Sequence, residues 1–249
     1  MFYRPAIFTP FPSLVAAESM RHGGVSPAPY SSLNLGTNTA DDPAHVRENR
    51  QRFCTALGFQ PEQLMLSRQV HGDQVLRVTG PGQAEGFDAL ITDQRGILLA
   101  VSVADCTPIL VFDQKNKGMA AIHAGWRGTA AGIVAKTLHA MAELFGSAGA
   151  DCWAYVGTCI DECSFAVGPE VALAFGADFK RLDVAKGQFL VDLKKANLAQ
   201  LLDFGLPAAQ IEVSPYSTVL HQERYFSHRR EGGVTGRMLA AIGTMNYEL

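Results

Sequence analysis

The stretch "DALITDQRGILLAVSVADCTPILVFD" (88–113) decides the fold class. Its density of valine, isoleucine and leucine predicts two strands around Gly96 that are buried on both faces. Its longest apolar run, "ILLAVSVA" (97–104), is far too short to span a membrane. The stretch therefore predicts strands at the buried centre of a sheet.

Further strands and helices mix on both sides of this centre. Residues 64–79 predict two strands with a turn at His71-Gly72-Asp73, and residues 118–125 and 151–157 predict one strand each. Helices are expected over 41–58, over 129–146 with Thr129 as the N-cap, and over 168–176, 192–207 and 235–243. Two pairings of adjacent strands look antiparallel, which favours a mixed α/β domain over a strictly alternating one. No linker or repeat interrupts the chain, so residues 1–249 are expected to form one domain.

Composition narrows the class of protein. The chain is 47% hydrophobic and 18% charged, as in an ordinary globular protein, and its net charge of -3 gives no reason to expect nucleic acid or a membrane surface as partner. Five cysteines, an odd number in a long chain, favour a reducing compartment. Early prolines break up any signal-peptide core, so we expect a cytoplasmic protein. No glycine pattern of a Rossmann fold or P-loop occurs, so no dinucleotide cofactor is expected.

Three predicted strand ends carry side chains that bind metals. His71, Cys106 and His123 are separated by 35 and 17 residues. Imidazole and thiolate together suit zinc, and three protein ligands leave a fourth position for water or substrate. From spacing alone the signal is weak, because most histidines and cysteines near a core are simply packed and hydrogen-bonded.

The segment "IHAGWRGTAAGI" (122–133) has the composition of a strand-to-helix turn. Gly125 and Gly128 would let the backbone turn sharply and approach a substrate closely. Arg127 would add a full charge beside the free N–H groups of the following helix, a suitable place for phosphate. In the alternative, such a turn is purely structural, Trp126 packs, and Arg127 pairs with a surface carboxylate.

Seven motifs in order carry a resemblance to a known family. They are "RHGGVS" (21–26), "LNLG" (33–36), "DDPAHVRENR" (41–50), "QVHG" (69–72), "ADCTPILVFD" (104–113), "IHAGWRGTAAGI" (122–133) and "FSHRREGGVTGRM" (226–238). Together they resemble the bacterial laccase-domain family. It is also called the multicopper polyphenol oxidase-like family, the peptidoglycan editing factors and, more recently, purine nucleoside phosphorylases.

The resemblance implies a fold and a site. The fold would be a single α/β domain of mixed β-sheets flanked by helices, the laccase-domain or cytotoxic-necrotizing-factor-like fold. A mononuclear zinc would be held by His71, Cys106 and His123, with copper the weaker candidate. Asn34 and Arg50 fall in family motifs that line the same pocket, and they are candidates for binding substrate or phosphate. Asp105 is a candidate general acid or base, or a residue that orients a ligand.

The resemblance also implies activities. The family is linked to phosphorolysis of adenosine, inosine and related nucleosides such as methylthioadenosine, and to deamination of adenosine. For deamination, zinc would lower the pKa of water from 15.7 toward roughly 7 for attack on the purine C6. We therefore expect a zinc-dependent purine nucleoside phosphorylase with adenosine deaminase activity, whose partners are purine nucleosides and phosphate.

Other functions remain open from the sequence. Cys106 could be a nucleophile with His123 or His71 as base, in an amidase that removes a wrong amino acid from a cell-wall precursor. A copper phenol oxidase fits worst, because seven scattered histidines with no HxH pair cannot ligate several coppers. A zinc-stabilised binding module would explain the ligands without catalysis. The segments "GTCIDECSFAVG" (157–168) and "SPYSTV" (214–219) depart from the family pattern, which puts the substrate preference in doubt.

Overall fold

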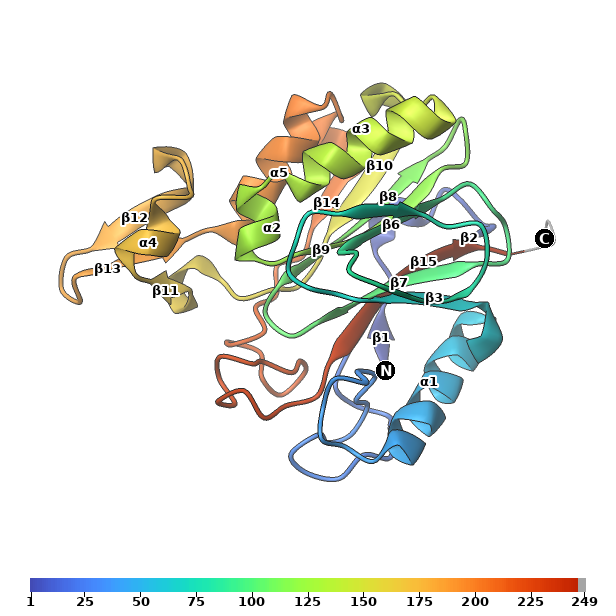
Figure 1. The fold of residues 1–249 in the computed structure, drawn as a ribbon, viewed down its shortest axis with the longest axis horizontal. Coiled ribbons are helices and arrows are strands. Elements are labelled where there is room, and N and C mark those ends of the chain that lie inside the picture. Colours follow the sequence, from blue (N-terminus) through green and yellow to red (C-terminus); the bar gives the residue numbers. More distant parts are fainter. Residues whose placement is uncertain (246–249) are drawn as a thin grey trace.

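Two stacked sheets form the body of the protein (Figure 1). The computed structural model describes residues 1–245. The first six-stranded sheet has the order β1 (Phe2–Tyr3), β2 (Leu14–Ser19), β15 (Met238–Thr244), β7 (Leu98–Val103), β3 (Leu64–Arg68) and β5 (Gly82–Glu85). The second has the order β14 (Ile211–Val213), β10 (Cys152–Val156), β8 (Thr107–Asp113), β9 (Met119–Ala124), β6 (Ala89–Thr92) and β4 (Val75–Arg77).

Strand β8 shows why the central strands are apolar throughout. All seven of its residues are buried. Leu110 and Phe112 point into the core between the two sheets, whereas Ile109 and Val111 belong to the core between the second sheet and its helices. Because successive side chains alternate between faces, a strand that is covered on both sides needs an uninterrupted apolar sequence.

Helices cover the two outer faces (Figure 1). Helix α1 (Pro43–Leu57) packs on the first sheet, and it begins where the Asp42 side chain accepts a hydrogen bond from the Ala44 N–H. Helices α3 (Ile133–Phe145) and α5 (Leu193–Asp203) pack on the second sheet, and the short helix α2 (Trp126–Ala130) connects β9 to α3. The predicted mixed α/β fold with sheets flanked by helices is confirmed.

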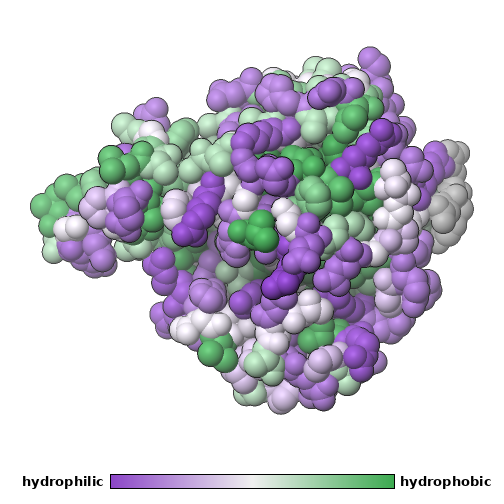
Figure 2. All heavy atoms as spheres, in the orientation of Figure 1, coloured by the Kyte–Doolittle hydropathy of each residue, from purple (hydrophilic) through white to green (hydrophobic). Residues whose placement is uncertain are grey.

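A small lobe projects from this body (Figure 1). It contains a three-stranded sheet of order β11 (Ala166–Val167), β13 (Gln188–Val191) and β12 (Lys180–Asp183), together with helix α4 (Pro169–Ala172). Figure 2 shows hydrophobic residues at its surface. Leu173 is 81% and Val184 is 82% exposed. The lobe begins at Ala166, within the segment 157–168 that departs from the family pattern.

Two of the predicted helices differ in the structure. Residues 235–243 are not helical, because 238–244 form β15 between β2 and β7, with both faces buried. Burial in a central strand overrides the helix preference of methionine, leucine and alanine. The helix predicted over 129–146 begins already at Trp126 and breaks at Gly132, whose φ is 77°, so Thr129 is not an N-cap.

The strand predictions were wrong in their pairing. Residues 64–79 do contain two strands, but β3 lies in the first sheet and β4 in the second, so they do not pair with each other. Residues 88–113 contain three strands, β6, β7 and β8, of which only β7 is in the first sheet. The chain therefore crosses between the sheets at each of these short connections. No helix within residues 1–245 is long and apolar enough to cross a membrane.

Candidate metal centre and active site

Three side chains that bind metals meet at one end of the stacked sheets. His71 lies in the connection from β3 to β4, Cys106 lies between β7 and β8, and His123 is near the end of β9. Their ligand atoms all lie within 4.8 Å of one another. The two imidazole rings are perpendicular, with centroids 4.9 Å apart. The chain crossings between the sheets thus bring the three residues together.

The backbone is unusual at this centre. His71 has a φ of 59° and Asp105, directly before Cys106, has a φ of 89°. Residues other than glycine rarely adopt this left-handed region, and they do so mainly where a functional site or tight turn requires it. Both residues stand in connections that leave one sheet and enter the other, so the sharp turns aim His71 and Cys106 at the same point.

Asp88 lies behind both histidines, and the sequence had given no reason to select it. Its buried carboxylate accepts hydrogen bonds from the N–H groups of Val70, His71 and Gly72 at 3.1, 3.0 and 2.9 Å. It also lies 2.7 Å from Nδ1 of His123. Burial acts to raise the pKa of Asp88, but His123 and the backbone donors lower it below its ordinary value. The carboxylate is thus suited to accept from all four groups.

The charges of the centre favour a thiolate. Burial alone would raise the pKa of the Cys106 thiol, but the neighbouring His123 and His71 lower it to about 6. Burial would lower the pKa of His123, but Cys106 and Asp88 raise it to about 9. A deprotonated sulfur beside two imidazoles is the donor set that binds soft or borderline divalent metals.

Gly125 and Gly128 of the segment 122–133 let protein groups approach each other. A Cβ at Gly125 would lie 3.1 Å from Sγ of Cys106 and 3.2 Å from Cδ2 of His71. A Cβ at Gly128 would lie 2.8 Å from the carbonyl oxygen of Gly72. The close approach expected of these glycines is therefore made to the metal-binding residues and their connection.

A cavity of about 430 Å³ opens beside the cluster and includes all three of its residues in its lining. Its single acidic lining residue is Asp105, whereas five arginines line it: Arg50, Arg68, Arg127, Arg229 and Arg237. The apolar lining residues are Leu66, Ala104, Trp126, Ile160, Phe165 and Leu193, and the last four belong to one hydrophobic cluster. A cavity with cationic and apolar parts suits a small ligand that carries both an anionic group and a flat apolar ring.

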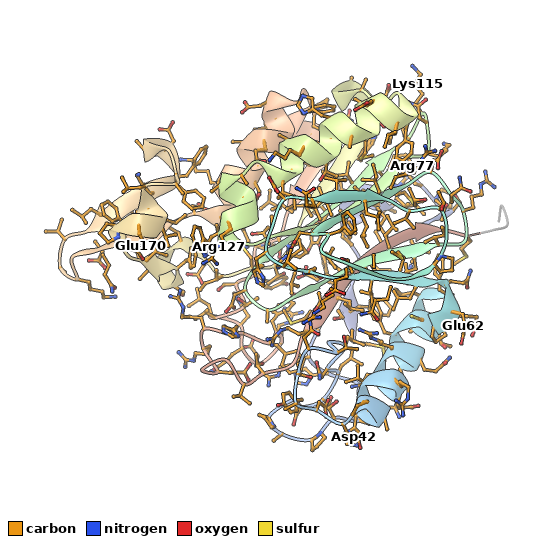
Figure 3. All side chains as sticks on the ribbon, in the orientation of Figure 1. Asp42, Glu62, Arg77, Lys115, Arg127 and Glu170 are labelled. Carbon is orange, nitrogen blue, oxygen red and sulfur yellow. The ribbon has the colours of Figure 1, made fainter. Side chains whose placement is uncertain are left out.

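The predicted binding residues take different positions. Arg50 lines the cavity, donates from Nε to the Leu35 carbonyl oxygen at 2.9 Å, and has its pKa lowered by burial. Arg127, labelled at helix α2 in Figure 3, also lines the cavity. Its guanidinium lies 4.3 Å from the centre of the Trp126 ring. It forms no ion pair with a carboxylate among residues 1–245. Helix α2 is too short to supply a strong dipole, so the charge at this point comes from Arg127 itself.

Asn34 lies behind the cavity wall and does not line it. It is fully buried, and its Nδ2 donates to Thr39 and Asp41. Its Oδ1 accepts from the backbone N–H groups of Gly36 and Arg237, both of which line the cavity. Its contacts are therefore with the residues that form the wall.

Asp105 lines the cavity, but its carboxylate is occupied. It accepts hydrogen bonds from Oγ1 of Thr218, from Oγ of Ser227 at 2.7 Å and from the Arg229 N–H at 2.6 Å. These bonds hold the 218–229 segment against the connection that carries Cys106. His228 and Arg229 in this segment line the cavity.

Residues of the site that were missed from the sequence include Arg68, Asp88, His228, Arg229 and Arg237. The last three stand in the motif "FSHRREGGVTGRM" (226–238), which had been matched as a whole without assigning roles. Arg237 carried a signal, a charge directly before an apolar run. Asp88 carried none, because an acidic residue at the start of a strand is common.

The fold and the cluster define the class of protein: an α/β domain with a centre of three metal-binding side chains beside a small-molecule cavity. Residues 15–245 match the model of the family described as multi-copper polyphenol oxidoreductase laccase, and the chain belongs to this family. The resemblance found in the sequence motifs is thereby confirmed.

Relatives and solved structures agree with this assignment. A "Purine nucleoside phosphorylase" of Bacteroides thetaiotaomicron is 40% identical, covering 89% of this chain and 88% of that protein. A "Purine nucleoside phosphorylase YlmD" of Geobacillus stearothermophilus is 38% identical, covering 94% and 91%. The crystal structure of YlmD from Geobacillus stearothermophilus superimposes with a TM-score of 0.91 at 36% identity, covering 96% of this chain and 94% of that one.

Proposed function

We propose that this protein is a zinc-dependent purine nucleoside phosphorylase that acts on adenosine, inosine and methylthioadenosine, and that it also deaminates adenosine. The observation that carries the proposal is a His-Cys-His cluster that opens into a cavity with five arginines and an apolar wall. The names of the relatives support the same reaction. The chain would act as one enzyme domain over 1–249, and we expect it in the cytoplasm.

The donor set fits zinc. Two imidazole nitrogens and one thiolate from His71, His123 and Cys106 leave a coordination position for substrate or water. Residues 1–245 contain this one cluster of three such side chains, whereas multicopper chemistry requires several. Copper therefore remains the weaker candidate. When bound, zinc would supply a Lewis acid that polarises an oxygen and lowers the pKa of water toward roughly 7.

In phosphorolysis, the arginines would bind the phosphate. Arg50, Arg127 and Arg237 come from three different parts of the chain and all face the cavity. Their guanidinium groups would hold a phosphate oxygen against C1′ of the ribose. The barrier of the chemical step would be lower because the reactants have already lost their orientational entropy on binding. The new bond forms from that oxygen to C1′ while the C1′–N9 bond breaks, and the purine leaves with the bonding pair and takes up a proton.

The apolar wall would bind the base. The wall presents flat or branched apolar surface from Ile160, Phe165 and Leu193. A purine ring buried against it would pay little free energy of desolvation, because the face of the ring is apolar. The position of Ile160 and Phe165 within 157–168 makes this wall the part that sets nucleoside preference.

Asp105 and Asn34 would act through other residues. Since the three donors to the Asp105 carboxylate fix the segment of His228 and Arg229, we assign Asp105 a positioning role and leave proton transfer to other groups. Asn34 would support substrate binding by holding Arg237 in the wall.

An amidase is the second candidate, because Cys106, His123 and Asp88 follow one another as in a Cys-His-Asp triad. In this reaction the thiolate would attack a carbonyl carbon, and His123 would hold the proton for the leaving amine. His71 at the same sulfur favours the metal, since a zinc-bound thiolate attacks poorly.

The test is chromatography of adenosine incubated with the purified, zinc-loaded protein, with and without phosphate. Adenine that forms only with phosphate supports phosphorolysis, and inosine in both samples supports deamination. Cys106→Ala should abolish both products, whereas Cys163→Ala, an exposed cysteine that does not line the cavity, should keep them. Intact adenosine in all samples with zinc bound would sink the proposal in favour of the amidase.

A further inference from the structure

One carboxylate contacts both histidines of the cluster, the backbone of His71 and the ring of His123. Oδ1 of Asp88 accepts from the His71 N–H and lies 2.7 Å from Nδ1 of His123, whereas Oδ2 accepts from the N–H groups of Val70 and Gly72. The residue is fully buried and precedes β6, next to β9 in the second sheet. No other side chain is needed to connect the two histidines.

We propose that Asp88 is the positioning residue of the metal centre, which fixes the tautomer of His123 and the place of His71 at the same time. The proposal rests on the proposed function only in taking the cluster to bind a metal. It concerns how the site is held before any nucleoside binds.

For His123, the carboxylate determines which nitrogen is free. An ionised carboxylate only accepts hydrogen bonds, so Nδ1 must carry a proton, and Nε2 is the nitrogen that can give its lone pair to a metal. The ring is 3% exposed, and the His123 N–H donates to the Asp88 carbonyl oxygen at 2.7 Å. The backbone and the side chain of Asp88 therefore hold both ends of the same ligand.

For His71, the carboxylate determines where the connection lies. This residue is exposed and outside any strand, and Val70 beside it is 57% exposed, so little apolar burial holds the connection. Three successive N–H groups, of residues 70–72, converge on Asp88 instead. These three hydrogen bonds from backbone N–H groups to one anion stabilise the left-handed backbone conformation of His71, whose φ is 59°.

A buried carboxylate can also be purely structural, and the chain contains a matched case. Asp113, at the opposite end of β8 from Cys106, is also fully buried, and it accepts from the N–H groups of Lys115 and Asn116 at 2.8 and 3.0 Å. It has no contact with the cluster. Asp113→Asn thus measures what loss of a buried, amide-binding carboxylate does without a metal ligand nearby.

The experiment measures the zinc dissociation constant of Asp88→Asn, Asp113→Asn and the unchanged protein by competition with a chromophoric chelator. In Asp88→Asn the new NH2 group faces N–H donors, so we expect zinc binding to weaken by about 10- to 100-fold. Asp113→Asn should bind zinc as the unchanged protein does, even if it melts earlier. Unchanged affinity in Asp88→Asn, or an equal loss in Asp113→Asn, would overturn the proposal.

Two further measurements keep the test decisive. Cobalt-substituted Asp88→Asn should show altered visible ligand-field bands, which a loss of stability alone does not produce. If this variant does not fold, amide exchange on the unchanged protein decides: the N–H groups of residues 70–72 should be protected despite their exposed side chains, and fast exchange there would refute the proposal. Failure of the unchanged protein to bind zinc refutes it as well. Because no nucleoside is present, a protein that passes these tests yet leaves adenosine intact contradicts the proposed function alone.

Discussion

Gly125 shows how little room there is around the side chains of the His-Cys-His cluster. Its backbone has φ of -70° and ψ of 171°, which any residue can adopt, so glycine is not needed there for conformation. It is needed because a side chain would meet Cys106 and His71 at once. Such a site is sensitive to displacements of a few tenths of an ångström.

We expect Gly125→Ala to fold and to lose activity. The added methyl group must push the sulfur of Cys106 or the ring of His71 aside, which should lower kcat/KM on the order of tenfold or more, because small misplacements of reacting groups are costly. Steady-state kinetics and circular dichroism check this. Gly80→Ala is the control, since nothing lies within 4 Å of its added Cβ. Equal activity in the two variants would mean that the cluster adapts freely.

At the scale of single residues, the sequence predicted the metal-binding side chains better than the carboxylate that holds them. His71, Cys106 and His123 could be selected because nitrogen and sulfur ligands interrupt apolar strands. The Asp88 carboxylate could not, because its function depends on three N–H groups 16 to 18 residues away and on a ring 35 residues away. Those contacts exist only after the two sheets have stacked.

Among the elements, the break between α2 and α3 is set by the backbone of Gly132. This residue has a φ of 77°, and a Cβ there would come near only Oε1 of Gln200, at 4.0 Å. The break lets α2 continue directly from the end of β9 that carries His123 while α3 turns along the second sheet. A single straight helix from Trp126 could not do both.

We expect Gly132→Ala to destabilise the protein by about 1–2 kcal/mol, because alanine is strained in the left-handed region. Gly132→Asn should cost less, since asparagine tolerates this region better. Chemical denaturation measures both. If alanine and asparagine cost the same, a contact and not the backbone would explain the loss.

The elements that could be predicted were those with a distinct period or cap, such as α1, which is capped by Asp42 before it and Gly58 after it. Strand β15 could not be predicted, because a strand buried on both faces has no alternation and its sequence "MLAAIG" suits a helix equally well. The pairing of β3 and β4 with different sheets also has no local signal, since a short turn serves a hairpin and a crossing alike.

For the whole molecule, Glu18 is a polar contact between the two stacked sheets. It lies on β2 of the first sheet and accepts from the hydroxyl of Tyr155, on β10 of the second sheet, at 2.6 Å. Thr158 donates to it from its N–H and its hydroxyl, and Lys194 adds a favourable charge. Burial nevertheless dominates and raises the pKa of Glu18 from 4.5 to about 7.

This raised pKa makes stability depend on pH. The folded chain keeps the proton of Glu18 at pH values where the unfolded chain has lost it, so this contribution is present below pH 4.5 and is lost as the pH rises through about 7. Between pH 5 and pH 8, Glu18 should lower the unfolding free energy of the unchanged protein by about 2 kcal/mol. Glu18→Gln should lack this loss, because glutamine does not titrate. Denaturation at both pH values measures this difference.

Glu212→Gln serves as the control for that comparison. It removes a carboxylate that also accepts from a tyrosine hydroxyl and a backbone N–H, but at a half-buried position. An equal change in both variants, or none in Glu18→Gln, would exclude the buried carboxyl as the source.

The projecting lobe has a consequence for engineering. The chain enters it at Ala166 and leaves it at Leu190, and these two residues are paired in one small sheet, so the lobe is a closed excursion with neighbouring ends. It contributes Phe165 to the apolar wall through the turn at its base, but none of the metal-binding residues. We expect residues 161–192 to be exchangeable between relatives as one segment: the exchange would replace Phe165 of the proposed base-binding wall and leave Ile160, Leu193 and the His-Cys-His cluster in place.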